Sequence, residues 1–237
     1  MTSADKHRAV TFIRVPAWHD ARTPQYEYWY DNVHIPLRMR QPGFLGAQRY
    51  ETLLGRQRYF VLYELADATA TESPEYLALR SWEAAQPADS FEAPATSRPG
   101  FERGIYDQTA GPSWPDPSLT APVAHIAGFQ PSEISEEEFL KKLELMYGTL
   151  FRAIPQIAAV RLFRLTGHSF RGSAKKTQMH TRFPRVIAIS YLAEESVMNA
   201  AKFAEVQRDA RLLENQRDHE PYLMVGRLKH TAFGAAG

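Results

Sequence analysis

An internal repeat constrains this chain more than any other feature of its sequence. Residues from Val10 to Tyr50 align with residues from Val123 to Phe163 at a constant offset of 113, without a gap. In both copies a β-rich run precedes a segment with helical periodicity, and a second β-rich run follows a proline. Two units of about 110 residues each fit the usual size of a small domain. We therefore expect a duplicated architecture.

Each copy is predicted to contain four strands and two helices in the order β-α-β-β-α-β. The strands are expected at residues 9–15, 47–53, 58–65 and 103–108, and again at 123–129, 159–165, 185–192 and 222–230. Helices are expected to begin at Thr23-Pro24, at Ser73-Pro74, at Ser135 and at about Glu195. A turn at Gly55 joins the middle strands of the first copy, and the long segment 166–184 joins those of the second.

This element order predicts an α+β fold made of tandem ferredoxin-like repeats. Such a unit is an antiparallel sheet with two helices on one face. The strand Tyr59-Phe60-Val61-Leu62-Tyr63 is apolar on both sides, so the face opposite the helices also needs a cover. Packing the two sheets together would form a dimeric α+β barrel within one chain. We expect a first domain at 1–109, a proline-rich linker at 110–122 and a diverged second domain at 123–237.

Composition excludes several classes of function. Lys plus Arg number 28 and Asp plus Glu number 27, so no nucleic-acid partner is expected. The chain has no cysteine, and its eight histidines lack metal-ligand spacing, so no metal site is expected. No membrane partner is expected, because no apolar run reaches the roughly 18 residues of a membrane span. Without the apolar core of a signal peptide, a cytoplasmic location is the default expectation.

The first copy alone carries a histidine on its first helix. His34 lies at the edge of an apolar stripe, whereas the second copy has Tyr147 at the aligned position. The stripe consists of Tyr26, Trp29, Tyr30, Val33 and Leu37. An imidazole exchanges protons near neutral pH, and Tyr30 lies one turn before it. We predict that His34 is a general acid/base assisted by Tyr30; the alternative is a histidine hydrogen-bonded at the helix–loop junction.

Two neighbours of His34 carry further expectations. Pro36 lacks an amide hydrogen, so it should free the carbonyl group of Asn32 and loosen the helix locally. Asp31 is expected to face solvent, because its helical angle places it outside the apolar stripe.

Aromatic and basic side chains are candidates for substrate binding. Ring faces stack on aromatic ligands, and arginines pair with carboxylates or phenolates. The candidates are Trp29, Tyr63, Tyr50, Arg14, Arg49, Phe12 and His125, which takes the aligned place of Phe12 in the second copy. The alternatives are core packing for the aromatic residues and His125, and exposed strand ends for the arginines. The basic segment 166–184 is either a lid or anion-steering patch, or a solvated insertion.

Four short motifs carry a family resemblance. Tyr28-Trp29, His34-Ile35-Pro36-Leu37, Pro42-Gly43-Phe44 and Arg49-Tyr50 resemble the EthD-like branch of the dimeric α+β barrel superfamily. The resemblance covers residues 9–108, whereas the second half is similar only in architecture. Members of that superfamily include cofactor-free monooxygenases, muconolactone isomerases, polyketide cyclases and decarboxylases, and haem proteins, so the fold does not fix the reaction. Family members are often single domains that dimerise, whereas this chain supplies both halves.

The resemblance and the residues together predict a cofactor-independent enzyme acting on an aromatic or polyketide-like small molecule. The expected chemistry is proton transfer by His34, as in a lyase, isomerase, cyclase or decarboxylase. The alternatives are a cofactor-free monooxygenase of an electron-rich phenol, a haem protein with His34 or His125 as axial ligand, and a non-catalytic ligand-binding module. The whole chain is also a candidate to form a homodimer.

Overall fold

The computed structural model describes residues 8–15, 21–54, 58–93, 101–170, 183–214 and 222–234. The predicted turn at Gly55 and residues 171–182 of the basic segment lie outside these ranges.

The strands of the described chain form one closed antiparallel barrel. Their bounds are β1 Ala9–Val15, β2 Phe44–Leu54, β3 Tyr59–Leu65, β4 Glu102–Ala110, β5 Val123–Phe129, β6 Ile157–Leu165, β7 Val186–Leu192 and β8 Tyr222–Phe233. The order around the barrel is β1-β3-β2-β8-β5-β7-β6-β4. The pairs β2–β8 and β4–β6 join the two halves and leave no sheet edge. The predicted α+β barrel is therefore confirmed.

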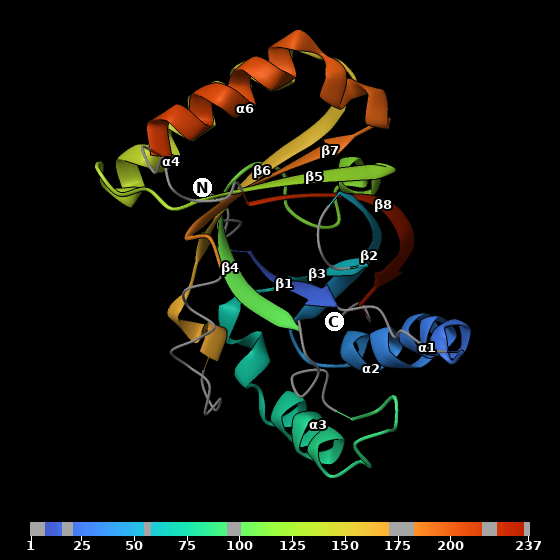
Figure 1. Cartoon of the computed structure of the whole chain (residues 1–237). Helices are drawn as coiled ribbons and strands as arrows, with labels where there is room; N and C mark the ends of the chain where they lie inside the picture. The colour runs from blue at the N-terminus through green and yellow to red at the C-terminus, as the bar shows by residue number, and fades with distance from the viewer. Residues whose placement is uncertain are drawn as a thin grey trace.

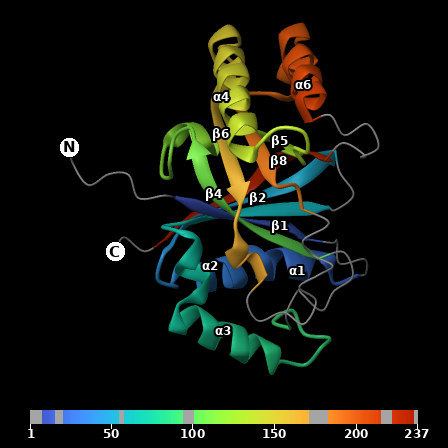
Figure 2. The same ribbon diagram turned by 90° about the vertical axis from the view of Figure 1, so that its left-hand side faces the viewer.

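The helices form two layers on opposite sides of the barrel (Figures 1 and 2). One layer contains α1 Thr23–Trp29, the π-helical turn η1 Tyr30–His34, α2 Ile35–Met39 and α3 Pro74–Ala84. The other contains α4 Glu136–Ala153 and α6 Ala201–Glu214. Short 3₁₀ turns are η2 Ala68–Glu72, η4 Pro117–Thr120, η5 Gly167–Phe170 and η6 Glu195–Asn199.

Helix starts follow the predicted capping residues in two of three cases. The hydroxyl groups of Ser73 and Ser135 accept hydrogen bonds from the third residue of their helices, as expected. The predicted cap at Thr23 is wrong, because Thr23 is already helical and follows Arg22, which makes no side-chain cap. The helix expected from Glu195 begins as a 3₁₀ turn, and its α-helical part starts at Ala201.

Three apolar clusters correspond to the layers. One fills the barrel with side chains from both halves, and one lies between each helix layer and the outer face of its half of the sheet. The segment between the halves contributes Trp114 and Leu119, both buried, to the barrel cluster. The indole N–H of Trp114 donates to the carbonyl group of Leu45 at 2.9 Å. The contacts of this segment therefore tie it to the barrel.

The structure corrects the gapless alignment of the repeat by one residue in its first strand. Phe12 faces the barrel interior, whereas His125 packs on α6 outside the barrel. Thr11 pairs with Tyr63 on β3, and His125 pairs with Ser190 at the equivalent position of β7. Thr11 is therefore the structural counterpart of His125. The connection to the first helix is one residue longer in the first half, and a slip of one residue turns a strand's side chains to its other face.

Candidate functional site

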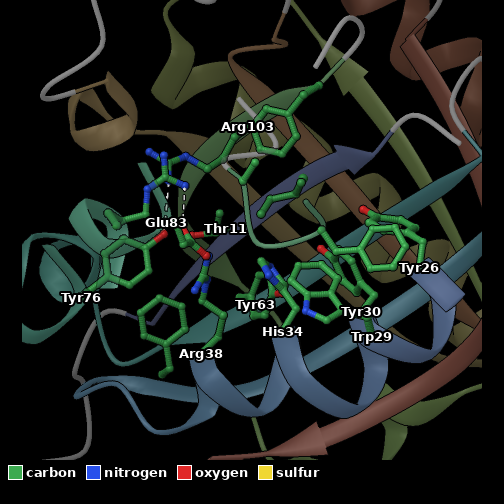
Figure 3. Close-up of a pocket in the computed structure, with 16 residues that line it drawn as sticks. Thr11, Tyr26, Trp29, Tyr30, His34, Arg38, Tyr63, Tyr76, Glu83 and Arg103 are labelled. Carbon is green, nitrogen blue, oxygen red and sulfur yellow. Dashed lines mark hydrogen bonds and ion pairs between the residues drawn. The ribbon is translucent and has the colours of Figure 1, made fainter. Parts of the chain in front are cut away.

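A small cavity lies between the outer face of the first-half sheet and the helices α1, α2 and α3 (Figure 3). Its volume is about 30 Å³, which is room for about two water molecules. Four predicted site residues line it: His34, Tyr30, Trp29 and Tyr63. The other lining residues are Thr11, Ile13, Tyr26, Arg38, Phe44, Tyr76, Arg80, Glu83, Phe91, Ala93, Phe101 and Arg103.

The π-helical turn η1 sets the position of His34. The N–H group of Ile35 donates to the carbonyl group of Tyr30, one residue further back than in an α-helix. The turn lies beside Pro36, where loosening of the helix was predicted. The imidazole ring lies 4.6 Å from the ring of Tyr30 and 5.0 Å from that of Trp29, measured between ring centres. His34 therefore lies between two aromatic rings at the cavity wall.

Tyr30 and Tyr63 supply neighbouring buried phenol groups, one from the helix layer and one from the sheet. Tyr30 belongs to η1 and Tyr63 to β3, and both are buried. Burial raises the pKa of Tyr30 well above its ordinary value, and the nearby Tyr63 raises it further. Burial also raises the pKa of Tyr63, despite the opposing effect of Arg38. Both groups therefore stay neutral near pH 7 and can donate hydrogen bonds to an oxygen atom.

A cluster of charged side chains forms the other end of the cavity. Arg38, with 5% of its side chain exposed, is ion-paired with Glu83. Arg80 lies 3.6 Å from the second carboxylate oxygen of Glu83. The guanidinium group of Arg103 donates to the hydroxyl group of Tyr76 at 3.3 Å. The cavity wall thus holds three guanidinium groups and one carboxylate, which pairs with Arg38 and lies near Arg80, and the excess charge is positive.

The arginines change the acidity of Tyr76. Burial by itself would raise the pKa of this phenol, but Arg103, Arg38 and Arg80 outweigh it and hold the pKa below its ordinary value. Arg38 also lies over the ring, with its guanidinium carbon 5.6 Å from the ring centre. Tyr76 therefore differs from Tyr30 and Tyr63, whose pKa values are raised.

Several polar atoms in the cavity wall have no hydrogen-bond partner among the described residues. They include Oγ1 of Thr11, Nε1 of Trp29 and Nη1 of Arg38. Thr11 and Arg38 are 3% and 4% exposed, so their polar groups have little access to bulk water. Buried polar groups normally have partners, and a bound molecule with acceptor atoms would supply them.

Five predicted substrate-binding residues do not line this cavity. Phe12 and Tyr50 belong to the barrel core, where the ring of Tyr50 stacks on Phe60 at 4.7 Å. Arg14 pairs with Glu102, and its guanidinium carbon lies 4.7 Å from the ring centre of Tyr222.

Arg49 and His125 make contacts outside the cavity. Arg49 forms two hydrogen bonds of 2.6 Å with Asp31, so the expectation that Asp31 faces solvent is wrong. His125 is buried against Phe203, with ring centres 4.9 Å apart, and burial lowers its pKa to about 4. A histidine that stays neutral in a helix–sheet core matches the alternative given above.

The charged half of the site was not predicted. Arg38 lies four residues after His34, and Tyr76, Arg80 and Glu83 have the spacing of one helix face, so sequence periodicity offered a signal for them. No sequence signal indicated that Arg103 belongs to the site. Its side chain reaches the cavity only because Arg103 pairs with Ile13, another cavity-lining residue, in the sheet.

The second half provides an internal comparison, because it repeats the layer without the charges. The strands β3 and β7 and the helices α3 and α6 correspond at an offset of 127. Tyr63, Tyr76, Arg80, Glu83 and Arg103 correspond to Ser190, Phe203, Gln207, Ala210 and Leu223. Phe203 and Ala210 are buried in the apolar cluster under α4 and α6. At these positions the second half therefore packs without ionised groups, although Arg211 on α6 lies over the ring of Phe129 nearby.

No group of three or more His, Asp or Glu side chains within the described residues could hold a metal ion. None of their helices combines the length and the apolar character that crossing a membrane requires.

Comparison of the whole structure with solved structures shows the fold. An anthrone oxidase-like protein superposes with a TM-score of 0.64 at 12% identity, over 100% of this chain and 97% of that one. A monooxygenase-like structure from Fusobacterium nucleatum gives 0.60 at 10% identity, over 97% and 95% of the two chains. Another from Lactobacillus acidophilus gives 0.53 at 10% identity, over 96% and 97%. No family model and no curated protein sequence matches this chain.

These similarities cover both halves in full. This chain therefore shares its complete two-sheet barrel with proteins whose sequences have diverged widely, and the likeness extends to the fold alone.

Proposed function

We propose that the chain is a cofactor-independent enzyme that transfers protons on an aromatic or polyketide-like small molecule in the first-half cavity. His34 takes a proton from a carbon next to a carbonyl group or from a phenol. The resulting enolate or phenolate accepts hydrogen bonds from Tyr30 and Tyr63, and the excess positive charge of the arginine cluster stabilises it. Return of the proton to another carbon or oxygen atom completes an isomerisation. In a cyclisation the enolate carbon first forms a bond to a second carbonyl carbon of the substrate, and the alkoxide that this leaves takes the proton from His34.

One observation supports this proposal most strongly. The only histidine on the cavity wall lies beside two neutral phenols and a net positive cluster, whereas the positions of the second half that correspond to Tyr63, Arg80 and Arg103 hold Ser190, Gln207 and Leu223. A developing negative charge is stabilised best by donors and cations that are already in place. The aromatic rings of Trp29, Phe91 and Phe101 offer surfaces for stacking, and they must move to admit a whole aromatic ligand, because the cavity has only about 30 Å³.

Anthrone is a suitable probe, since its methylene group loses a proton to give an aromatic enolate. Without oxygen, we expect the protein to accelerate exchange of that methylene with deuterated water, measured by proton NMR. In His34→Ala the rate should fall about 10²- to 10⁴-fold, because a general acid/base contributes about that much. His230→Gln on β8 is the control. An unchanged exchange rate in His34→Ala, with the fold intact by circular dichroism, would remove His34 from the mechanism.

The second candidate function is a cofactor-free monooxygenase, and the fold shared with anthrone oxidase-like and monooxygenase-like proteins favours it. The first step is the same, and the enolate then reacts with dioxygen. With anthrone, one dioxygen is consumed for each anthraquinone and water formed. An oxygen electrode distinguishes the two candidates, because uptake that matches substrate loss identifies the monooxygenase.

The remaining alternatives have less support. The motifs around His34 favour the EthD-like branch within this fold. Haem binding has less support at both candidate ligands: His125 is buried against Phe203 in a packed core, and a haem beside His34 would need a much wider opening of the cavity than a flat three-ring ligand does. A non-catalytic carrier would bind anthrone without His34-dependent exchange.

A further inference from the structure

The arginine cluster has a feature that proton transfer does not require. The mostly buried wall holds three guanidinium groups and a single carboxylate, Glu83, which lies against Arg38 and Arg80 while Arg103 contacts Tyr76. Like charges that share a buried site repel one another, and Arg80 is the clearest case, because burial and the neighbouring Arg103 lower its pKa. An added anion would relieve this repulsion.

The fold does not need these charges. The corresponding positions in the second half hold Phe203, Gln207, Ala210 and Leu223, and that layer forms the same structure. Ion pairs buried for stability alone gain little over apolar side chains of similar volume. A role in binding therefore explains the arginines better than a role in folding.

The cavity also has unused donors at this end. Nη1 of Arg38 is buried and has no hydrogen-bond partner among the described residues, and neither does Oγ1 of Thr11. A guanidinium group presents parallel N–H donors that match the two oxygens of a carboxylate. From these contacts we infer that the arginine end of the cavity binds the carboxylate of an aromatic acid.

The position of Arg38 adds a constraint on the ligand. Arg38 lies four residues after His34, about 6 Å further along the helix axis, and both side chains line the cavity. The substrate then carries its anionic group and its reacting atom at separate ends, with its ring towards Trp29 and Phe91. This inference rests on the proposed function for the reacting atom, whereas the binding of the anion can be tested separately.

The test compares benzoate with benzamide, its neutral counterpart of nearly equal shape, by isothermal titration calorimetry. Benzoate should bind at least about tenfold more tightly, because hydrogen bonds to a charged group are stronger than neutral ones. Equal affinities, or no binding of benzoate, would overturn the inference.

Two variants of opposite charge effect exclude a merely structural explanation. Arg103→Gln should weaken benzoate binding about tenfold, and Glu83→Gln should strengthen it, because the cavity gains net positive charge. Arg208→Gln, on the exposed face of α6, is the matched control and should have no effect. Weakening by both cavity variants would indicate damage to the fold and would contradict the inference.

Binding and proton transfer can fail independently. His34→Ala should retain the benzoate affinity within about twofold. If benzoate binds as expected but anthrone exchange is equally fast in the unaltered protein and in His34→Ala, the anion site is supported and the proposed function is wrong. If exchange depends on His34 while benzoate and benzamide bind alike, the opposite conclusion holds.

Discussion

Tyr76 shows how strongly one side chain depends on its neighbours. Its pKa lies below the ordinary value of 10.0, because three arginines outweigh the effect of burial. We expect a spectroscopic titration to show one tyrosine that ionises at lower pH than the others, and Tyr76→Phe should remove that step. Arg103→Gln should move the same step to higher pH. A titration that is identical in Tyr76→Phe and the unaltered protein would contradict the assignment.

His125 makes stability depend on pH. Its pKa is 6.5 in an unfolded chain and about 4 in the folded protein, because burial disfavours the charged ring. Between these values the unfolded chain binds a proton that the folded chain does not. The contribution of the neutral His125 to the free energy of unfolding should therefore be complete above pH 6.5. It should fall by on the order of 3 kcal/mol as the pH is lowered towards 4.

Denaturant titrations of the unaltered protein and His125→Gln at several pH values measure this term. The difference in unfolding free energy between the two proteins should change with pH in that window and be constant above it. A constant difference throughout would show that His125 does not titrate on unfolding.

At the scale of elements, the sequence predicted every barrel strand and the main helices to within a few residues, because their period and capping signals are local. It did not predict the register of the repeat, since the length of one connection decides which face His125 occupies. It placed His34 beside a cavity because the helical stripe is visible in the sequence. The arginine cluster joins α2, α3 and β4, and only tertiary packing brings those elements together.

The pairing of Arg49 with Asp31 connects β2 to the π-helical turn. Two hydrogen bonds of 2.6 Å join the groups, and only 5% of the Arg49 side chain is exposed. We expect Asp31→Asn to lower the free energy of unfolding by about 2 kcal/mol, because it leaves a buried guanidinium without its counter-charge. Urea denaturation measures the loss. Asp209→Asn, an exposed pair on α6, is the control and should change stability by less than about 0.5 kcal/mol.

At the scale of the whole molecule, one ion pair crosses the barrel interior between the halves. Arg161 on β6 and Glu64 on β3 are 0% and 1% exposed, and their closest atoms are 2.6 Å apart. Glu64→Ala should lower stability by about 3–5 kcal/mol, since it leaves a buried charge unpaired. Fluorescence and circular dichroism should report one shared unfolding transition, because the barrel core is common to both halves. Two separate transitions would contradict this shared core.

The second half gives the molecule a built-in template for engineering. Its α6 and β8 present Phe203, Gln207, Ala210 and Leu223 where the other half carries Tyr76, Arg80, Glu83 and Arg103. Transplanting these side chains by Phe203→Tyr, Gln207→Arg, Ala210→Glu and Leu223→Arg, with Tyr147→His on α4, would place a second such set on the far side of the same barrel. One polypeptide would then carry two sites, and the activity of each could be measured against that of the other.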